Sequence, residues 1–148
     1  LKSYYGNMNE RQFRNVFRQA LQKRGNTTEN FIGLLERRLD TVIYRAKFAT
    51  TVFSARQLIN HGHIKVNGKK VNISSFLVSD KDTIELKDKS KELLVVAGAL
   101  VSKEREIPDY IQMDDKNKIA KLIRVPKFSE VPYPTIMEPN LVVEYYSR

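Results

Sequence analysis

The stretch that decides the fold runs from Glu36 to Val71 and reads ERRLDTVIYRAKFATTVFSARQLINHGHIKVNGKKV. It opens on apolar residues spaced three and four apart, the spacing of one buried face of an amphipathic helix; they are Leu34, Leu35, Leu39, Val42, Ile43 and Ala46. Arg38 and Arg45 lie seven positions apart and therefore share one face of this helix, roughly 100° from the apolar stripe. The stretch thus predicts a helix with a cationic flank.

A second, shorter helix is predicted directly behind it. Ser54 carries a hydroxyl suited to an N-cap, and Leu58 and Ile59 fall on one side of the helix while Gln57 and His61 fall on the other. Gly62 is the natural stop, because glycine tolerates the backbone conformation in which many helices end.

A β-hairpin is predicted next. Two short apolar-containing runs, residues 64–66 and 69–71, flank the dipeptide Asn67-Gly68. A type I′ turn needs positive φ at both central residues, and Asn-Gly supplies it more readily than almost any other pair. Two short helices and a hairpin would then present polar and cationic side chains from neighbouring elements, which indicates an RNA-binding surface.

The phrases RLD (38–40), SARQLINHGHI (54–64) and KVNGKKVNI (65–73) closely resemble the RNA-binding module named after the small-subunit ribosomal protein S-four. The flanks YYGNMNERQFRN (4–15), KRGNTTENFIGLLE (23–36) and LVVEYYSR (141–148) are similar to the rest of that protein family, so the resemblance covers nearly the whole chain. It implies an α+β fold: a subdomain of N-terminal and C-terminal helices with an inserted module of two helices packed on a small, mostly antiparallel sheet. We expect a helical subdomain at residues 1–34, the module at 35–98, and a C-terminal segment at 99–148 that returns to the first subdomain.

Charge agrees with a polyanionic partner. The 148 residues carry 26 Lys and Arg against 17 Asp and Glu, a formal charge of +9. Residues 1–70 hold 14 basic and 4 acidic side chains, whereas residues 71–148 hold 12 and 13. We therefore expect RNA at the N-terminal half and the hairpin.

The candidate RNA contacts come from both predicted subdomains. Residues 9–24 are expected to form a helix that Gly25 ends, with Phe13, Val16, Phe17, Ala20 and Leu21 as its buried stripe and a row of arginines on another face. That row is either a solvated basic face or a phosphate contact, and the family resemblance favours the second. The full candidate set is Arg11, Arg14, Arg18, Arg38, Arg45, Lys47, Ser54, Arg56, Gln57, His61, Lys65, Asn67 and Lys69.

The remaining chain predicts shorter elements. We expect strands at 76–78 and 83–87, a helix at 92–104, and a hairpin between 110–113 and 119–124. Four prolines within residues 126–139 predict an extended segment, either a tether or a contact with rRNA or a protein neighbour. The spacing of Leu141, Val142, Tyr145 and Tyr146 predicts a last helical turn that docks on the N-terminal helices.

Catalytic and metal chemistry have no signature in the sequence. There is no cysteine, no HExxH motif and no phosphate-binding glycine loop. His61 and His63 lack further ligands for a metal, and Ser54 lacks a base that would make it a nucleophile. We expect no cofactor, no metal, no enzymatic activity and no membrane segment.

The resemblance implies a structural constituent of the small ribosomal subunit that binds its rRNA and nucleates assembly of the 5′ domain. Neighbouring small-subunit proteins are expected partners, and messenger RNA near the channel where it enters the ribosome is a further candidate. An RNA-modifying enzyme, a tRNA synthetase and a stand-alone RNA-binding stress or ribosome-rescue protein are the alternatives that share the module. The chain starts at Leu1, so the N-terminal segment usual in the family is expected to be missing from it. A one-residue excess in YYGNMNERQF and the proline-rich tail favour a mitochondrial matrix ribosome over one in a bacterial cytoplasm.

Overall fold

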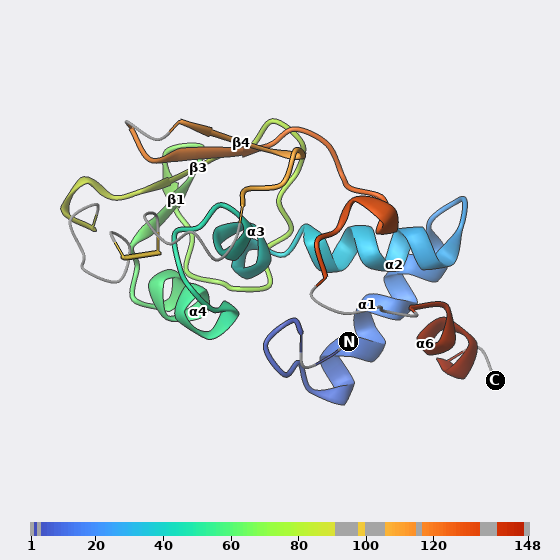
Figure 1. Ribbon diagram of the computed structural model, residues 1–148. Coiled ribbons are helices and arrows are strands. Elements are labelled where there is room, and N and C mark those ends of the chain that lie inside the picture. The colour runs from blue at the N-terminus through green and yellow to red at the C-terminus, as the bar shows by residue number, and fades with distance from the viewer. Residues whose placement is uncertain are drawn as a thin grey trace. The chain divides into compact units, whose positions relative to one another are not determined.

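The computed structural model describes residues 2, 4–90, 98–99, 106–114, 117–133 and 139–146 (Figure 1). The chain divides into two compact units: Leu1–Glu36 with Pro126–Arg148, and Arg37–Val125. The helix predicted at 92–104 lies outside the described residues except for Gly98 and Ala99, which are helical.

The first unit contains helices α1 (Glu10–Gln22), α2 (Thr27–Glu36) and α6 (Pro139–Tyr146), with a 3-10 turn η2 (Phe128–Glu130). A capping box starts α1, because the Asn9 side chain accepts from the backbone N–H of Gln12 while the Gln12 side chain accepts from that of Asn9. The helix starts where the sequence predicts and ends two residues short of the predicted Arg24.

Only part of the predicted stripe on α1 is buried. Phe13, Phe17 and Ala20 are buried, as predicted. Val16 is half-buried, and Leu21 is wrongly assigned to the stripe because 52% of its surface is exposed. Leu21 is one residue from the end of the helix, and the other described residues of this unit leave much of its side chain uncovered.

The C-terminal helix docks within the first unit as predicted, but Leu141 and Tyr145 of the predicted contact set are exposed. Its Tyr146 ring lies 5.2 Å from the ring of Phe17 and 6.1 Å from that of Phe13, centroid to centroid. Pro139 is the first residue of α6, a position at which the missing N–H of proline costs no helical hydrogen bond. The last proline of the tail therefore starts a helix.

The continuous helix expected through Leu34 to Ala46 is wrong, because α2 ends at Glu36 and α3 (Leu39–Arg45) begins only at Leu39. The two residues between them pair with a distant segment instead. Val78 N–H donates to Arg37 O at 2.8 Å, Leu39 N–H donates to Phe76 O at 2.8 Å, and Arg38 forms an isolated antiparallel bridge with Leu77. Residues 76–78 therefore pair with the segment between α2 and α3, and the strand predicted there does not join the sheet.

The second unit contains a sheet of five antiparallel strands in the order β2-β1-β3-β5-β4. The strands are β1 (Ile64–Val66), β2 (Lys69–Lys70), β3 (Thr83–Leu86), β4 (Ile111–Asp114) and β5 (Ile119–Leu122), with a 3-10 turn η1 (Asp88–Ser90) after β3. The hairpin predicted between 110–113 and 119–124 is confirmed by the pairing of β4 with β5. The α+β class with a mostly antiparallel sheet is likewise confirmed.

Helices α3 and α4 (Val52–Asn60) lie together on one face of this sheet (Figure 1). One apolar cluster joins them to the strands, and it contains Val42 and Ile43 of α3, Ile59 of α4, and Ile64 and Ile84 of the sheet, all with no exposed surface. Burial of this kind stabilises a module by about 1.5–3 kcal/mol per large apolar side chain. The core therefore fixes which sides of α4 and the hairpin face solvent.

Candidate nucleic-acid interface

Helix α4 starts earlier than Ser54 predicts. Thr51 is the N-cap, and its hydroxyl oxygen accepts from the backbone N–H of Ser54 at 3.0 Å. The Thr51 hydroxyl also lies 3.1 Å from the half-buried Ser54 hydroxyl. Assigning the cap to Ser54 is therefore wrong, because its own hydroxyl lies inside the first turn that Thr51 caps.

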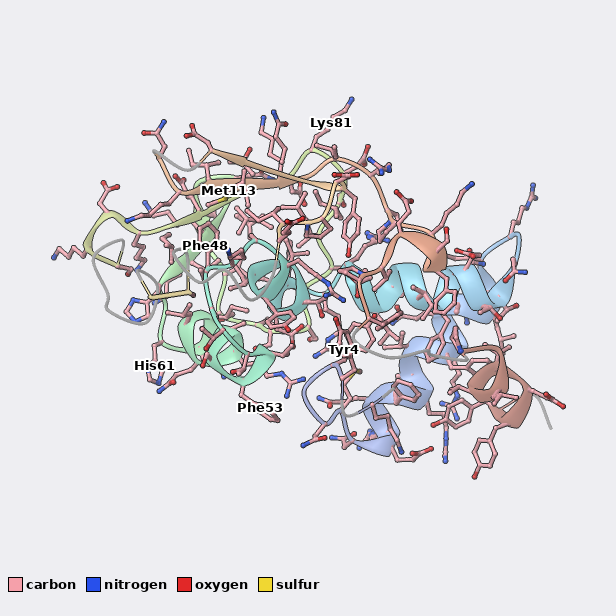
Figure 2. The ribbon with its side chains drawn as sticks, in the orientation of Figure 1. Tyr4, Phe48, Phe53, His61, Lys81 and Met113 are labelled. Carbon is pink, nitrogen blue, oxygen red and sulfur yellow. The ribbon has the colours of Figure 1, made fainter. Side chains whose placement is uncertain are left out.

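The outer side of α4 is polar. Gln57, Asn60 and His61 are exposed, and His61 is the C-cap residue just before Gly62. Phe53 is exposed as well, at 56% of its surface, and Figure 2 shows it and His61 at opposite ends of the helix. Gly62 has φ +80° and ends the helix as predicted.

The hairpin carries lysines on both strands. Asn67 has φ 52° and Gly68 has φ 82°, which confirms the predicted I′-type turn. Lys65 pairs with Lys70 across the two strands, and Lys69 and Lys70 are exposed. A Cβ placed on Gly62 would lie only 2.7 Å from Cε of Lys70, so the Lys70 side chain crosses directly over the end of α4. The Lys70 side chain thus lies at the end of α4, and we use the name α4–hairpin surface for the polar residues of these two neighbouring elements: Gln57, Asn60, His61, Lys65, Lys69 and Lys70.

The side chain of Asn67, expected to face RNA, forms hydrogen bonds with other residues of the protein. Its Nδ2 donates to Oδ1 of Asp82 at 3.0 Å, and its Oδ1 accepts from the backbone N–H of Thr83 at 2.9 Å. Oδ2 of Asp82 in turn accepts from the N–H of Ser79 at 2.9 Å. Asn67 therefore ties the hairpin turn to the loop before β3.

Two of the predicted contact arginines are buried. Arg38 is 5% exposed and Arg45 is 3% exposed, whereas the sequence pattern places both on a flank of a helix. Arg38 precedes α3 as its N-cap and turns inward to Asp40, with its Nε 3.3 Å from Oδ1 and its Nη2 3.3 Å from Oδ2. The guanidinium of Arg45 lies 5.6 Å from the ring of Tyr44. Lys47 follows α3 with φ 67° and is half-buried.

Asp40 is the residue that sequence reasoning missed. It has no exposed surface, and Nε of Arg56 donates to its Oδ2 at 2.9 Å. Arg56 lies 16 residues away on another helix, so no local spacing in the sequence indicates that the two residues pair. Lys70 was also missed, because nothing in the sequence distinguishes it from the other lysines next to the turn.

The three arginines of α1 belong to the first unit, where all are exposed. Arg14 lies 3.9 Å from Glu10, one helical turn earlier. The pKa of Glu10 is lowered from its usual value, first by the hydrogen bond from Lys2 and then by that from Tyr146. Burial, followed by the same hydrogen bond to Glu10, raises the pKa of Tyr146 to about 12.

Neither a cluster of metal-binding side chains nor a helix able to span a bilayer is found in the described part of the chain. It contains no cluster of three or more His, Cys, Asp and Glu side chains placed to hold a metal ion. His63 is instead engaged by Ser90, whose Oγ lies 2.6 Å from its Nδ1. None of the described helices combines the length and the apolarity that crossing a bilayer requires.

Two family models match this architecture unit by unit. Residues 37–84 match the S4 domain, and residues 1–36 match the ribosomal protein S4/S9 N-terminal domain. Along all 148 residues the chain is 67% identical to the small ribosomal subunit protein uS4 of Pelagibacter ubique, 58% to that of Methylobacterium nodulans and 55% to that of Gluconacetobacter diazotrophicus. In each case the match covers 100% of this chain and 72% of the relative.

Fold, surface and matches together define a ribosomal RNA-binding protein of the S4-domain class. The chain belongs to the uS4 family of small ribosomal subunit proteins. It is a constituent of the small subunit that binds rRNA through its S4 domain, and it is not an enzyme. The relatives give no support to the expected mitochondrial location, and the alternative of a stand-alone rescue protein is set aside because the likeness runs through both units.

Proposed function

We propose that the α4–hairpin surface and the arginine row of α1 are the two places at which this chain grips small-subunit rRNA. The observation that carries the first is the passage of Lys70 over Gly62, which brings a lysine of the hairpin to the polar end of α4. A lysine close to a phosphate displaces condensed counterions, and neutralising about six phosphates would weaken binding roughly a thousandfold between 50 and 200 mM salt.

The proposed contacts divide by exposure. Arg11, Arg14 and Arg18 of α1 and Gln57, His61 and Lys69 of the α4–hairpin surface are exposed, while Arg56, Lys47 and Lys65 are partly buried. We assign Arg38, Arg45, Ser54 and Asn67 to supporting this surface, because their side chains are buried or take part in contacts within the protein. Recognition of folded RNA would rest on its shape and backbone, since A-form grooves display little readable sequence.

The proposal extends to the role of the chain in subunit assembly and to its compartment. Two separate grips suit a protein that holds different rRNA helices of the 5′ domain early in assembly, next to other small-subunit proteins and to messenger RNA near its channel. We propose the bacterial cytoplasm as the compartment, supported by the organisms of the relatives. The full-length gene in its genomic context would test this, because genes of a bacterial ribosomal operon beside it would agree and a mitochondrial targeting segment would not.

Binding of the whole chain to a 5′-domain transcript, measured by filter binding over a range of salt, tests the role of the hairpin. We expect Lys65→Ala with Lys69→Ala to lower the slope of log Kd against log salt by about 2, because each lysine is proposed to neutralise one phosphate. Lys121→Ala is the matched control, because Lys121 is an exposed lysine on β5 of the same unit. An equal change in the control and the double variant would refute a specific role of the hairpin.

A further inference from the structure

A buried carboxylate joins the two module helices. Asp40 of α3 accepts from Arg38 and from Arg56 of α4, and both of its oxygens are used. We propose that Asp40 is a positioning residue for RNA binding: it fixes the Arg56 guanidinium at the protein surface in the orientation in which that group meets RNA. The inference rests on the proposed contact between Arg56 and rRNA.

The hydrogen bonds around Asp40 leave its carboxylate one orientation. Oδ1 accepts from the backbone N–H of Thr41 at 2.7 Å and from Nε of Arg38 at 3.3 Å. Oδ2 accepts from Nη2 of Arg38 at 3.3 Å and from Nε of Arg56 at 2.9 Å. Because Nε is the atom nearest the aliphatic stem, holding it sets the plane of the Arg56 guanidinium.

The two arginines differ in exposure, which assigns them different roles. The Arg38 side chain is 6% exposed and serves to hold the carboxylate, whereas that of Arg56 is 23% exposed and reaches solvent. The Phe53 ring lies 5.7 Å from Cζ of Arg56 on the same helix and limits its movement further. Of the two guanidinium groups that donate to Asp40, that of Arg56 is therefore the one that is presented to solvent.

Stability alone does not explain this arrangement. Burying ions costs desolvation energy that their attraction often only offsets, so a well-packed apolar group of similar volume would stabilise the module about as well. A partly exposed arginine that is already held, in contrast, loses little rotamer freedom when RNA binds, and immobilising such a side chain is a real cost of association.

Asp40→Asn gives a test in which two explanations predict opposite changes in RNA affinity. The substitution removes a negative charge from a basic protein, so bulk electrostatics alone would tighten RNA binding. Loss of positioning would weaken it, by about two- to tenfold at fixed salt. Asp80→Asn is the control, because Asp80 is exposed in the loop before β3 and its substitution changes only the charge. Asp40→Asn binding as tightly as Asp80→Asn would overturn the proposal.

Arg56→Ala separates the inference from the proposed function. Removing a charge-assisted hydrogen bond to RNA should weaken binding about 5- to 150-fold, and Arg56→Ala without effect would remove Arg56 from the interface. If Arg56→Ala weakens binding but Asp40→Asn does not, only the positioning role fails. In the Arg56→Ala background, we expect Asp40→Asn to change affinity by less than about twofold, because there is no guanidinium left to position. A further loss of affinity there would show that Asp40 acts through the fold and would refute positioning.

The unsubstituted chain supplies a measurement that does not depend on a variant folding. Nε–H of Arg56 donates to a buried carboxylate, so its NMR signal should be dispersed and exchange slowly with water before any RNA is added. Through-bond correlation with the assigned backbone of Arg56 identifies the signal in the unsubstituted chain. An Arg56 signal that exchanges as fast as that of the exposed Arg11 would mean that the guanidinium is not held, and positioning would be refuted.

Discussion

The hydrogen bonds of Asn67 lead to a prediction about stability at a residue that the sequence marks for RNA binding. Replacing it by glycine removes the hydrogen bonds to Asp82 and Thr83 but keeps a residue that accepts φ 52°. Removing each bond should cost about 0.5–1.5 kcal/mol, so Asn67→Gly should lower the free energy of unfolding of the second unit by about 1–3 kcal/mol. Asn67→Ala should lower it by about 1–2 kcal/mol more, because alanine is strained in the left-handed region.

Urea unfolding followed by NMR signals of the amides of Val66 and Thr83 measures these changes. Both residues belong to strands of the second unit, so their signals report the unfolding of that unit. Asn72→Ala is the control, since Asn72 is an exposed asparagine soon after the same hairpin. We expect Asn67→Gly to bind the 5′-domain transcript within about twofold of the unsubstituted chain, because the Asn67 side chain is engaged within the protein. Unchanged stability together with a large loss of affinity, on the order of tenfold, would refute the reasoning and make Asn67 an RNA contact.

Three further predictions concern α1, the core and pH. Arg11→Ala with Arg18→Ala should weaken binding to the transcript and lower its salt slope by about 2, whereas a purely solvated row would leave both unchanged. Ile59→Ala should cost about 2–5 kcal/mol in urea unfolding of the second unit, because Ile59 has no exposed surface, and a cost below about 1 kcal/mol would contradict its place in the core. The pKa of Tyr146 is raised from 10 to about 12, so its contribution to folding is complete below pH 10 and is lost as pH rises toward 12, where the unfolded chain has already released its proton. In an absorbance titration of tyrosinate, Tyr146→Phe should remove the absorbance of one tyrosine from the part of the curve above pH 10, and a titration unchanged in that range would contradict the raised pKa.

The local signals in the sequence predicted most of the module. Asn67-Gly68 indicated the turn, Gly62 indicated the helix end, and the apolar spacing indicated the buried faces of α3 and α4. Each of these is decided by a residue's own backbone preference or by a short repeat, so a single sequence is enough to reveal it.

The break between α2 and α3 could not be read in the same way. The apolar repeat continues from Leu35 through Leu39, and neither glycine nor proline stands between them. The interruption comes from hydrogen bonds between residues 37–39 and residues 76–78, which lie far apart in the chain. The same long-range pairing explains why the strand predicted at 76–78 does not join the sheet, since those residues pair with residues 37–39 instead.

Charge in the sequence is also an incomplete guide to an RNA surface, because a count treats every arginine as equally available. Arg38 and Arg45 contribute to the basic excess of the first 70 residues, yet both are buried, and Arg38 is paired with Asp40. Salt dependence reports only the cations that reach phosphates, so it should reflect the exposed lysines of the hairpin and the exposed arginines of α1 more than the formal charge. Arg38 acts one step earlier than an RNA contact: by fixing Asp40, it helps to decide where the charge of Arg56 is presented.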